Sequence, residues 1–406
     1  MPTTEANAEL PVFDAEFVDD LYAKYREIRS ETPVQRMVTP QGMQLWVITR
    51  YEDARNALTD PRLAKDFRRT GEIMDRMDRD GGIRRPFNSA LNEQMLNLDP
   101  PDHTRLRKLV VKAFTARRVE NLRPRVEQIA ADLLDAMSEH DEVDLLDAFA
   151  FPLPIQVICE LLGVDEERRD DFRQWTNTLL DASSAEATSQ AGAAMAEYLV
   201  ELIAAKRAEP ADDLLTALIE ATEDADRLSE GELVSMVFLL LVAGHETTVN
   251  LIGNGVLALL RNPEQWAALK ADPELVAGAV EETLRFDGPV MHGTLRHTTE
   301  PVTIGEVTIP EGELVWVGLA SANHDPDRFE APESFDITRD AQGHLAFGHG
   351  IHFCLGAPLA RMEGQIALRR LAERFPDLAP AAELDDVRWR FSTLIHGLKT
   401  LPVRLK

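Results

Sequence analysis

The stretch that decides the fold is Phe347-Gly348-His349-Gly350-Ile351-His352-Phe353-Cys354-Leu355-Gly356. A helical pattern starts directly after it, at Ala357-Pro358, so Cys354 is expected just ahead of a helix. Unpaired backbone N–H groups and the helix dipole favour a thiolate at that place. Gly348 and Gly350 let the backbone approach a flat ligand closely. The pattern predicts that Cys354 has a chemical role.

The second cysteine, Cys159, lies in the apolar run 157–162 and is interpreted as a buried structural residue. An alternative for the Cys354 segment is a zinc site made of His349, His352 and Cys354, but a second nearby cysteine to complete a common four-ligand set is missing from the sequence. With two cysteines in 406 residues there is no disulfide framework. The reducing cytosol is therefore the expected compartment.

The composition around this segment is that of a soluble globular protein. Of 406 residues, 44% are hydrophobic and 28% charged, which excludes a disordered or collagen-like chain. Seventy acids against 43 bases give a net charge of −27, which argues against binding to nucleic acid or anionic membranes. The apolar run 233–244 is shorter than the ~20 residues that span a bilayer. We expect a cytoplasmic protein without a membrane anchor or signal peptide.

Periodicity predicts one domain over residues 1–406, mainly α with a smaller β-rich lobe built from segments near both ends of the chain. Alternating residues predict strands at 45–49, 302–309 and 314–319. Helical spacing covers 119–162, 195–221 and 229–261. The acidic run 209–232 is interpreted as a solvent-exposed face or loop.

The longest predicted helix begins at a capping box, Ser229 to Glu232, and runs about 30 residues, or ~45 Å, to Pro263. Inside it stands Ala243-Gly244-His245-Glu246-Thr247-Thr248. The Thr247 hydroxyl can bond to the carbonyl of Ala243, four residues back, and Gly244 lacks side-chain bulk, so we expect a notch there. His245 is interpreted as a packed or solvent-linked residue.

The cysteine segment resembles the haem-binding signature of the cytochromes P450, Phe-x-x-Gly-x-Arg/His-x-Cys-x-Gly. The resemblance covers nearly the whole chain and implies a P450 fold, haem b as the cofactor and the long helix lying over the haem. It implies that the Cys354 thiolate is the iron ligand, where it supplies electron density for O–O cleavage. The loop residues that it assigns to the cofactor are Phe347, Gly348, His352, Cys354 and Gly356.

A second resemblance concerns the long helix. Ala243, Gly244, Glu246 and Thr247 match the family's oxygen-activation motif, Ala-Gly-x-Asp/Glu-Thr. O–O cleavage needs two protons in a largely dry pocket, which requires a hydroxyl and an acid linked to solvent. The resemblance therefore implies that Glu246 and Thr247 are the catalytic pair.

The bound cofactor would need cations, because ferric porphyrin, thiolate and two propionates together carry a net charge of about −2. A helix is predicted to start at 99–102, and His103 and Arg107 follow it four residues apart on one face. The resemblance assigns these two residues, together with Arg296 and His352, to the propionates.

A further family pair is Glu282 and Arg285, on a helix predicted between Asp272-Pro273 and Gly288-Pro289. This Glu-x-x-Arg pair braces the haem core in the family. The arginine that usually completes it, in a Pro-Glu-Arg-Phe stretch, is Ser334 here. Arg328 and Arg339 are the alternative third members.

Bases without an acid between them occupy the segment 105–118: Arg105, Arg107, Lys108, Lys112, Arg117 and Arg118. They predict a positive patch on which an acidic electron donor lands. The resemblance implies a separate ferredoxin and ferredoxin reductase, since the sequence has no flavin domain, nicotinamide domain or ferredoxin-type cysteine set.

The implied function is O2-dependent hydroxylation or epoxidation of a bulky apolar molecule, such as a macrolide or other polyketide, a steroid or a vitamin D-like secosteroid. The residues expected to contact it are Ala243, Val290, His292, Leu394 and Ile395. Arg68, Arg69 and the loop 70–92 are expected to form a lid. Two alternatives stay open, a peroxide-driven haem peroxygenase and a non-catalytic haem-based sensor or carrier.

Overall fold

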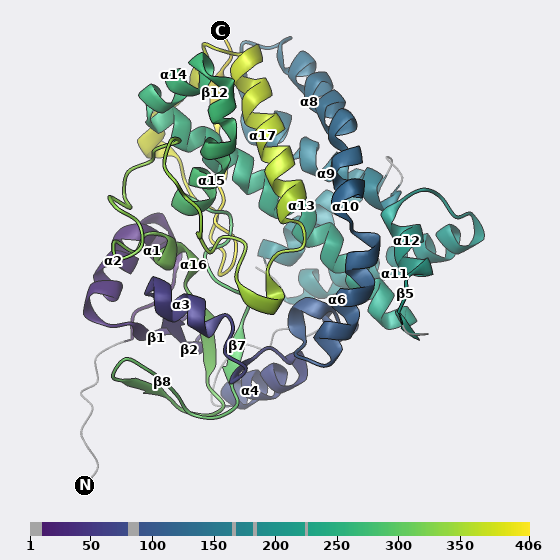
Figure 1. The fold of residues 1–406 in the computed structure, drawn as a ribbon, viewed down its shortest axis with the longest axis vertical. Coiled ribbons are helices and arrows are strands. Elements are labelled where there is room, and N and C mark those ends of the chain that lie inside the picture. The colour runs from purple at the N-terminus through teal and green to yellow at the C-terminus, as the bar shows by residue number, and fades with distance from the viewer. Residues whose placement is uncertain (1–9, 80–88, 165–167, 182–184, 224–225) are drawn as a thin grey trace.

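Helices make up most of the computed structural model, and a smaller region of sheet lies beside the first helices of the chain, α1 (Ala15–Asp19) and α2 (Leu21–Glu31) (Figure 1). The structure describes residues 10–79, 89–164, 168–181, 185–223 and 226–406. This arrangement confirms the predicted fold class, a mainly helical protein with a smaller β-rich part.

The main sheet joins segments that are distant in the sequence. Its five strands lie in the order β1-β2-β10-β7-β3. Their bounds are Val34–Val38, Gln44–Ile48, Leu314–Val317, Arg296–Thr298 and Leu63–Ala64. β10 runs parallel to β2, with Val315 opposite Trp46. The predicted strand at 302–309 is a separate hairpin of β8 (Val302–Ile304) and β9 (Val307–Ile309).

The helix predicted over 119–162 is wrong in its middle. The segment contains α7 (Ala116–Asn121), α8 (Arg123–Met137), strand β4 (Glu142–Asp144), a π-helical turn (Leu146–Ala150) and α9 (Pro152–Leu162). β4 pairs with β12 (Pro402–Arg404), which also pairs with β11 (Ala379–Pro380). One valine between two acids, paired with the far end of the chain, gives no local strand signal.

The acidic run 209–232 is also more ordered than expected. It contains α12 (Leu214–Glu220), which buries Leu214, Leu215 and Leu218, and it follows α11 (Ala185–Ala208). Asp213 caps α12 by accepting a hydrogen bond from the backbone N–H of Thr216 at 2.7 Å. The acids therefore flank a buried helix and do not form a continuous solvated face.

α13 (Glu230–Arg261) is the 32-residue helix through the centre of the molecule (Figure 1). The capping box is present, since the Ser229 hydroxyl accepts from the Glu232 N–H and the Glu232 carboxylate accepts from the Ser229 N–H. By length and composition this helix could cross a membrane, but 61% of its most apolar window is buried inside the protein. In the described structure α13 is therefore a buried core helix.

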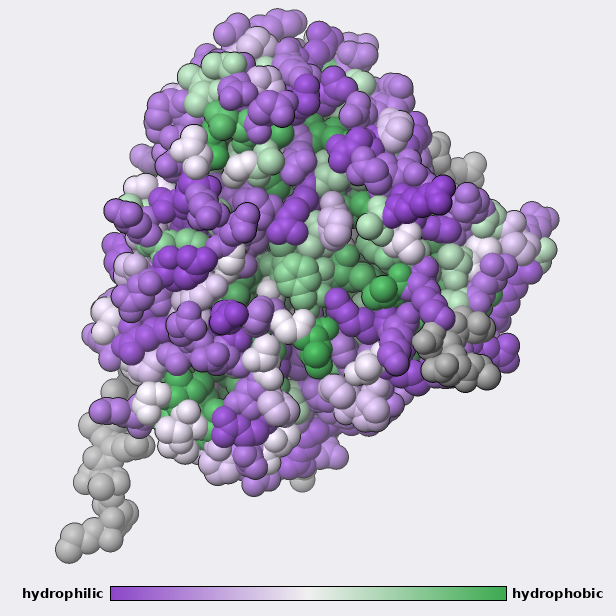
Figure 2. All heavy atoms as spheres, in the orientation of Figure 1, coloured by the Kyte–Doolittle hydropathy of each residue, from purple (hydrophilic) through white to green (hydrophobic). Residues whose placement is uncertain are grey.

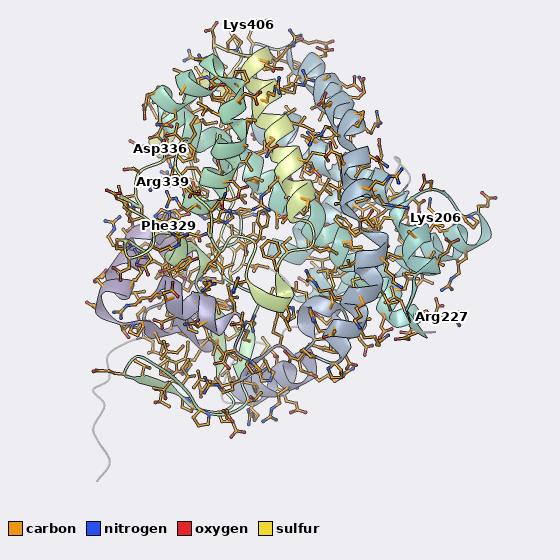
Figure 3. The ribbon with its side chains drawn as sticks, in the orientation of Figure 1. Lys206, Arg227, Phe329, Asp336, Arg339 and Lys406 are labelled. Atoms are coloured by element: carbon orange, nitrogen blue, oxygen red, sulfur yellow. The ribbon has the colours of Figure 1, made fainter. Side chains whose placement is uncertain are left out.

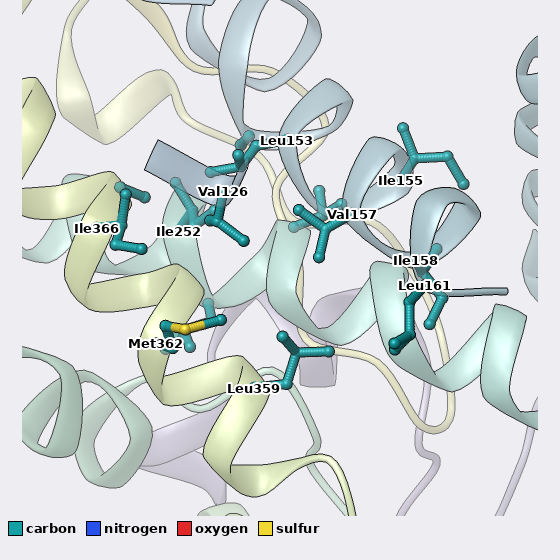
Figure 4. Packing of buried hydrophobic residues seen from close by; sticks show 14 of the residues in the cluster. Val126, Leu153, Ile155, Val157, Ile158, Leu161, Ile252, Leu359, Met362 and Ile366 are labelled. Atoms are coloured by element: carbon teal, nitrogen blue, oxygen red, sulfur yellow. The ribbon is translucent and has the colours of Figure 1, made fainter. Parts of the chain in front are cut away.

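Side chains of α8, α9 and α17 (Ala357–Arg374) pack against side chains of α13 in one hydrophobic cluster (Figure 4). A Cβ atom at Gly244 would come within 2.9 Å of Cδ1 of Ile158, on α9. Gly244 therefore allows the close approach of α9 and α13, whereas the sequence predicted that its missing side chain contributes to a notch in the helix. Cys159, on the same helix, is fully buried, as predicted.

A buried ion-pair network on α15 (Val276–Phe286) supports the chain that leads to the cysteine loop. Nε and Nη2 of Arg285 each donate to the Glu282 carboxylate at 2.8 Å, and both side chains are buried. Arg339 Nε donates to the same carboxylate at 3.2 Å, so Arg339 is the third member. Arg328 instead donates to the carbonyl of Gln342. Figure 3 shows Arg339 beside Asp336, whose N–H also donates to Glu282.

Replacing Glu282 by alanine leaves Arg285 buried without its carboxylate. We expect Glu282→Ala to lower the free energy of unfolding by about 3–5 kcal/mol, measured by denaturant unfolding of the purified protein. Glu120→Ala, which breaks an exposed pair with Arg123, is the control and should leave the unfolding midpoint nearly unchanged. Equal midpoints for the two variants would contradict this account of the network.

Candidate active site

The cysteine loop ends at the N-terminus of α17, as the sequence predicts. The Cys354 N–H donates to the carbonyl of Phe347 at 2.9 Å, which closes the loop, and Gly356 is the N-cap of the helix. Gly348 and Gly350 have φ values of 70° and 75°. At Gly350 a side chain would meet Thr59 at 2.7 Å, so both the conformation and the close approach require glycine.

The Cys354 thiol does not have the acidity that its position suggested. Cys354 is exposed by surface area, but the atoms packed around its sulfur desolvate the thiol and raise its pKa above the usual value. The backbone N–H groups of Gly356 and Ala357 lower the pKa and compensate only in part. The helix N-terminus therefore does not stabilise the thiolate sufficiently by itself. A bound metal cation would, because a coordinated thiol is deprotonated.

One face of α13 is open at the predicted oxygen motif. Ala243 is exposed and Thr247 is half-buried, although most of the helix around them is buried. The Thr247 hydroxyl donates to the carbonyl of Ala243 at 2.8 Å, as predicted, and the helix continues without a break. Thr247 therefore presents its oxygen lone pairs on the open face.

Glu246 is buried and its carboxylate is paired. Arg390 forms an ion pair with Oε1, and Asn250 Nδ2 lies 3.4 Å from the same oxygen. The Arg390 side chain is 26% exposed, so it connects the buried acid to the surface. Sequence reasoning did not identify Arg390, because an arginine in a C-terminal stretch has no local signal that relates it to α13.

His245 is a packed residue, which agrees with its interpretation from the sequence. Its Nδ1 lies 2.8 Å from the carbonyl of Leu241, and its ring is buried against Phe151. Burial lowers its pKa. We therefore assign His245 no role in holding a ligand.

The four basic residues assigned to the propionates converge near the cysteine loop. The rings of His103, on α6 (Asp102–Ala113), and His352 lie 4.3 Å apart. Arg107 Nη2 donates to the carbonyl of Phe353 at 2.8 Å, and Arg296 donates to the carbonyls of Leu63 and Leu58. Burial lowers the pKa of Arg296 to about 10. Burial and neighbouring cations lower the pKa of His352 to about 2.

These residues fit a porphyrin with two carboxylates. Both ring nitrogens of His103 and Nε of Arg296 are buried and have no hydrogen-bond partner among the described residues. Unpaired buried donors of this kind are costly unless a ligand satisfies them. The zinc alternative is not supported, because the described residues include no group of three or more His, Cys, Asp or Glu that could hold a metal ion.

The segments predicted to contact substrate lie side by side. Val290 and Ile395 form a β-bridge, and the Met291 N–H donates to the carbonyl of Leu394 at 2.9 Å. The prediction for His292 is wrong. Its ring is fully buried, stacks on Trp316 at 4.5 Å, and has both nitrogens occupied, by the Tyr25 hydroxyl and by the carbonyl of Thr393.

The lid prediction needs a similar correction. Residues 67–79 form helix α4 and 89–92 form α5, so much of the expected loop is helical, and 80–88 lie outside the described residues. Arg68 pairs with Glu93 and Arg69 with Glu72, all at the surface. Both arginines are therefore held in ion pairs at the surface, Arg69 with an acid of the same helix and Arg68 with an acid beyond α5.

The basic segment 105–118 is less uniformly positive than predicted. Arg105 pairs with Asp226 and Glu232, and Arg118 pairs with Asp212. Lys108, Lys112 and Arg117 are exposed.

Apolar residues lie near the cysteine loop on the outside of the molecule. Ile351 and Phe353 are 48% and 41% exposed. A recess of about 790 Å³ lies beside them, lined by Phe347, His349, Phe353 and Arg361 among others. Figure 2 shows apolar residues gathered at the middle of this face, around the lower end of α17, within a polar surround.

Comparison with known proteins identifies the family. The family model "Cytochrome P450" matches residues 155–383. The chain is 64% identical to Cytochrome P450 107B1 of Saccharopolyspora erythraea over 99% of both chains. It is 48% identical to the Vitamin D(3) 25-hydroxylase of Pseudonocardia autotrophica over 99% of this chain and 98% of that one. The tirandamycin C-bound P450 monooxygenase TamI superposes with a TM-score of 0.91 at 51% identity, covering 98% of this chain and all of that one.

Similarity of this extent covers both the cysteine loop and the oxygen motif on α13. It rejects the sensor alternative, since the relatives are named as hydroxylases and monooxygenases. The chain belongs to the cytochrome P450 family, as a bacterial monooxygenase that takes haem b as its cofactor.

Proposed function

We propose that this monooxygenase hydroxylates or epoxidises a bulky apolar small molecule of secondary metabolism, of the macrolide, polyketide or steroid-like class, with electrons from a separate ferredoxin and its reductase. The observation that carries the proposal is a pair of neighbouring residues on α13. Thr247 lies on the open face of the helix, and Glu246, next to it in sequence, is buried. The names of two relatives support the substrate class, the Vitamin D(3) 25-hydroxylase and the 46% identical 6-deoxyerythronolide B hydroxylase of Saccharopolyspora erythraea.

When bound, the haem supplies the iron at which O2 is reduced. In the proposal Cys354 holds that iron, and His103, Arg107, Arg296 and His352 hold the propionates. These residues would hold the cofactor by its iron and by its carboxylates, and Ala243 and Thr247 lie on the open face of α13.

Protons are delivered from α13. The Thr247 proton is committed to the carbonyl of Ala243, so the hydroxyl oxygen accepts a hydrogen bond on the open face. It thus holds a water or another donor in place there. Glu246 is the acid that resupplies the proton, and Arg390 is its connection to solvent. Because Arg390 and Asn250 hold the carboxylate in the buried position, the carboxylate has to move away from them to take up a proton from solvent at each turnover.

The substrate is held by apolar contacts. Ala243 offers a small methyl group, and Val290, Leu394 and Ile395 come from two segments joined by the Val290–Ile395 bridge. None of these side chains carries a charge or a hydrogen-bonding group. A large apolar molecule gains affinity there at roughly 25 cal/mol per Å² of buried apolar surface.

We expect Thr247→Ala to keep haem and substrate binding but to uncouple NADH consumption from product formation. Thr247 positions the group that donates the proton, and positioned proton transfer contributes at least ~10²-fold to a rate, so we expect product per NADH to fall about tenfold or more, with peroxide released instead. The substrate is chosen by a haem spectral-shift screen of macrolides, steroids and fatty acids. Product and peroxide are then quantified per NADH.

Thr247→Ser is the matched control, because it keeps the hydroxyl and should keep most of the coupling. The same assay driven by hydrogen peroxide tests the peroxygenase alternative, which does not need Glu246 and Thr247. Unchanged coupling in Thr247→Ala, or efficient turnover with peroxide and none with ferredoxin and NADH, would refute the proposed proton delivery.

The proposed landing site of the ferredoxin is the outer face of the cysteine loop. Lys108, Lys112 and Arg117 supply exposed positive charge, and Ile351 and Phe353 supply exposed apolar surface. Arg107, on the same helix as the two lysines, donates to the carbonyl of Phe353, so this helix contacts the cysteine loop. Exposed positive charge together with apolar surface fits an acidic electron donor. In a chain with a net charge of −27, the attraction has to be local.

Reversing two of these charges tests the landing site. We expect the double variant Lys108→Glu, Lys112→Glu to be reduced by ferredoxin about tenfold more slowly at low salt. The difference should shrink as the ionic strength rises above ~0.1 M, where the Debye length is ~10 Å. Stopped-flow reduction under carbon monoxide measures the rate, and the double variant Lys270→Glu, Lys399→Glu is the control. Equal effects of the two double variants would place the donor elsewhere.

A further inference from the structure

Lys65 is a buried lysine that is not among the four basic residues assigned to the propionates. It follows β3, which pairs antiparallel with β7, the strand that carries Arg296. Its backbone N–H donates to Oδ2 of Asp99 at 2.8 Å, which fixes the residue. The residue is 3% exposed, and Nζ donates to the hydroxyl of Thr294 at 2.5 Å.

This ammonium group has no counter-ion in the described part of the chain. Asp99 is the nearby acid, but its Oδ2 accepts the backbone N–H groups of Lys65 and Asp66. Burial, and then the charge of Arg296, lower the pKa of Lys65 well below its usual value. A buried cation in this state is costly unless an anion approaches it.

The charged neighbours of Lys65 are themselves basic. The charge of Lys65 contributes to the lowered pKa of His103, whose ring lies 4.3 Å from that of His352. Lys65, His103, Arg107, Arg296 and His352 thus form one cluster, in which the cations destabilise one another. Such a cluster is stable when a ligand brings negative charge into it.

The cluster also has N–H donors that bind no protein acceptor, and Lys65 contributes two of them. Both terminal nitrogens of Arg296 and one of Arg107 already bind carbonyl groups of the protein. An ammonium group has three N–H donors, and Thr294 takes one, so Lys65 has two left. The Thr294 hydroxyl accepts from Lys65, and its own proton is therefore free for a second acceptor.

We propose that Lys65 is a fifth basic residue that binds the haem, donating from Nζ to one propionate carboxylate with the Thr294 hydroxyl beside it. Arg107 and Arg296 supply two permanent charges, and they give one and two of their five N–H donors, respectively, to backbone carbonyls. Lys65 supplies a further charge and free donors at the same place. The residue escaped sequence analysis because a single lysine after a short strand is normally a surface residue.

The test compares Lys65→Met with wild-type holoenzyme. We expect haem transfer to apomyoglobin to be about tenfold faster in the variant, because a charge-assisted hydrogen bond is lost. The reduction potential of the iron should become more negative, since a cation beside the propionate is gone. Lys65→Arg should retain most of the wild-type behaviour, and Lys399→Met, which removes an exposed lysine, should change neither quantity.

Resonance Raman separates a propionate contact from a structural role. The propionate bending band should shift in Lys65→Met, while the reduced carbon monoxide spectrum, which reports Cys354 ligation, stays unchanged. If Lys65→Met yields no holoenzyme, Lys65→Gln, which keeps an N–H donor without the charge, provides the comparison. A Raman band at the wild-type position with a haem transfer rate within about twofold of wild type would overturn the proposal. None of these readouts depends on the substrate.

Discussion

The rest of the structure depends on one electrostatic requirement, that the sulfur of Cys354 carry a negative charge where the protein makes this unfavourable. Although Cys354 is exposed by surface area, desolvation of its sulfur raises the pKa of the free thiol, and the N–H groups at the start of α17 only partly compensate. The iron of the haem provides the missing positive charge. Gly350 lets the cysteine loop pack closely against Thr59.

The same reasoning applies to the propionates of the cofactor, where the protein groups are positive and the ligand groups are negative. There a group of buried bases, with unpaired donors on His103 and Arg296, requires an anion. Protein and haem are therefore complementary in charge, and each is destabilised without the other. This local positive site exists in a chain with 70 acids and 43 bases, so it cannot be inferred from net charge. The network of Glu282, Arg285 and Arg339 supports the segment that leads into the cysteine loop.

Much of the fold and the centre of the site could be predicted from the sequence, because they rest on local patterns. The capping box of α13, the Thr247–Ala243 hydrogen bond and the helix after Cys354 are all short-range features. The failures involve long-range partners. β4 exists because it pairs with the C-terminal strand β12, and His292 is buried by Tyr25 and Trp316. Arg390 pairs with Glu246 across a sequence separation of 144 residues, and Lys65 bonds to Thr294 across a separation of 229 residues.

The most direct measurement is the absorption spectrum of the purified protein, reduced under carbon monoxide, for wild type and for Cys354→Ser. The account predicts a red-shifted Soret band in the wild type that is lost in the variant, because a serine oxygen does not replace the thiolate at the iron. A colourless wild-type protein, or a red-shifted band that persists in Cys354→Ser, would contradict it.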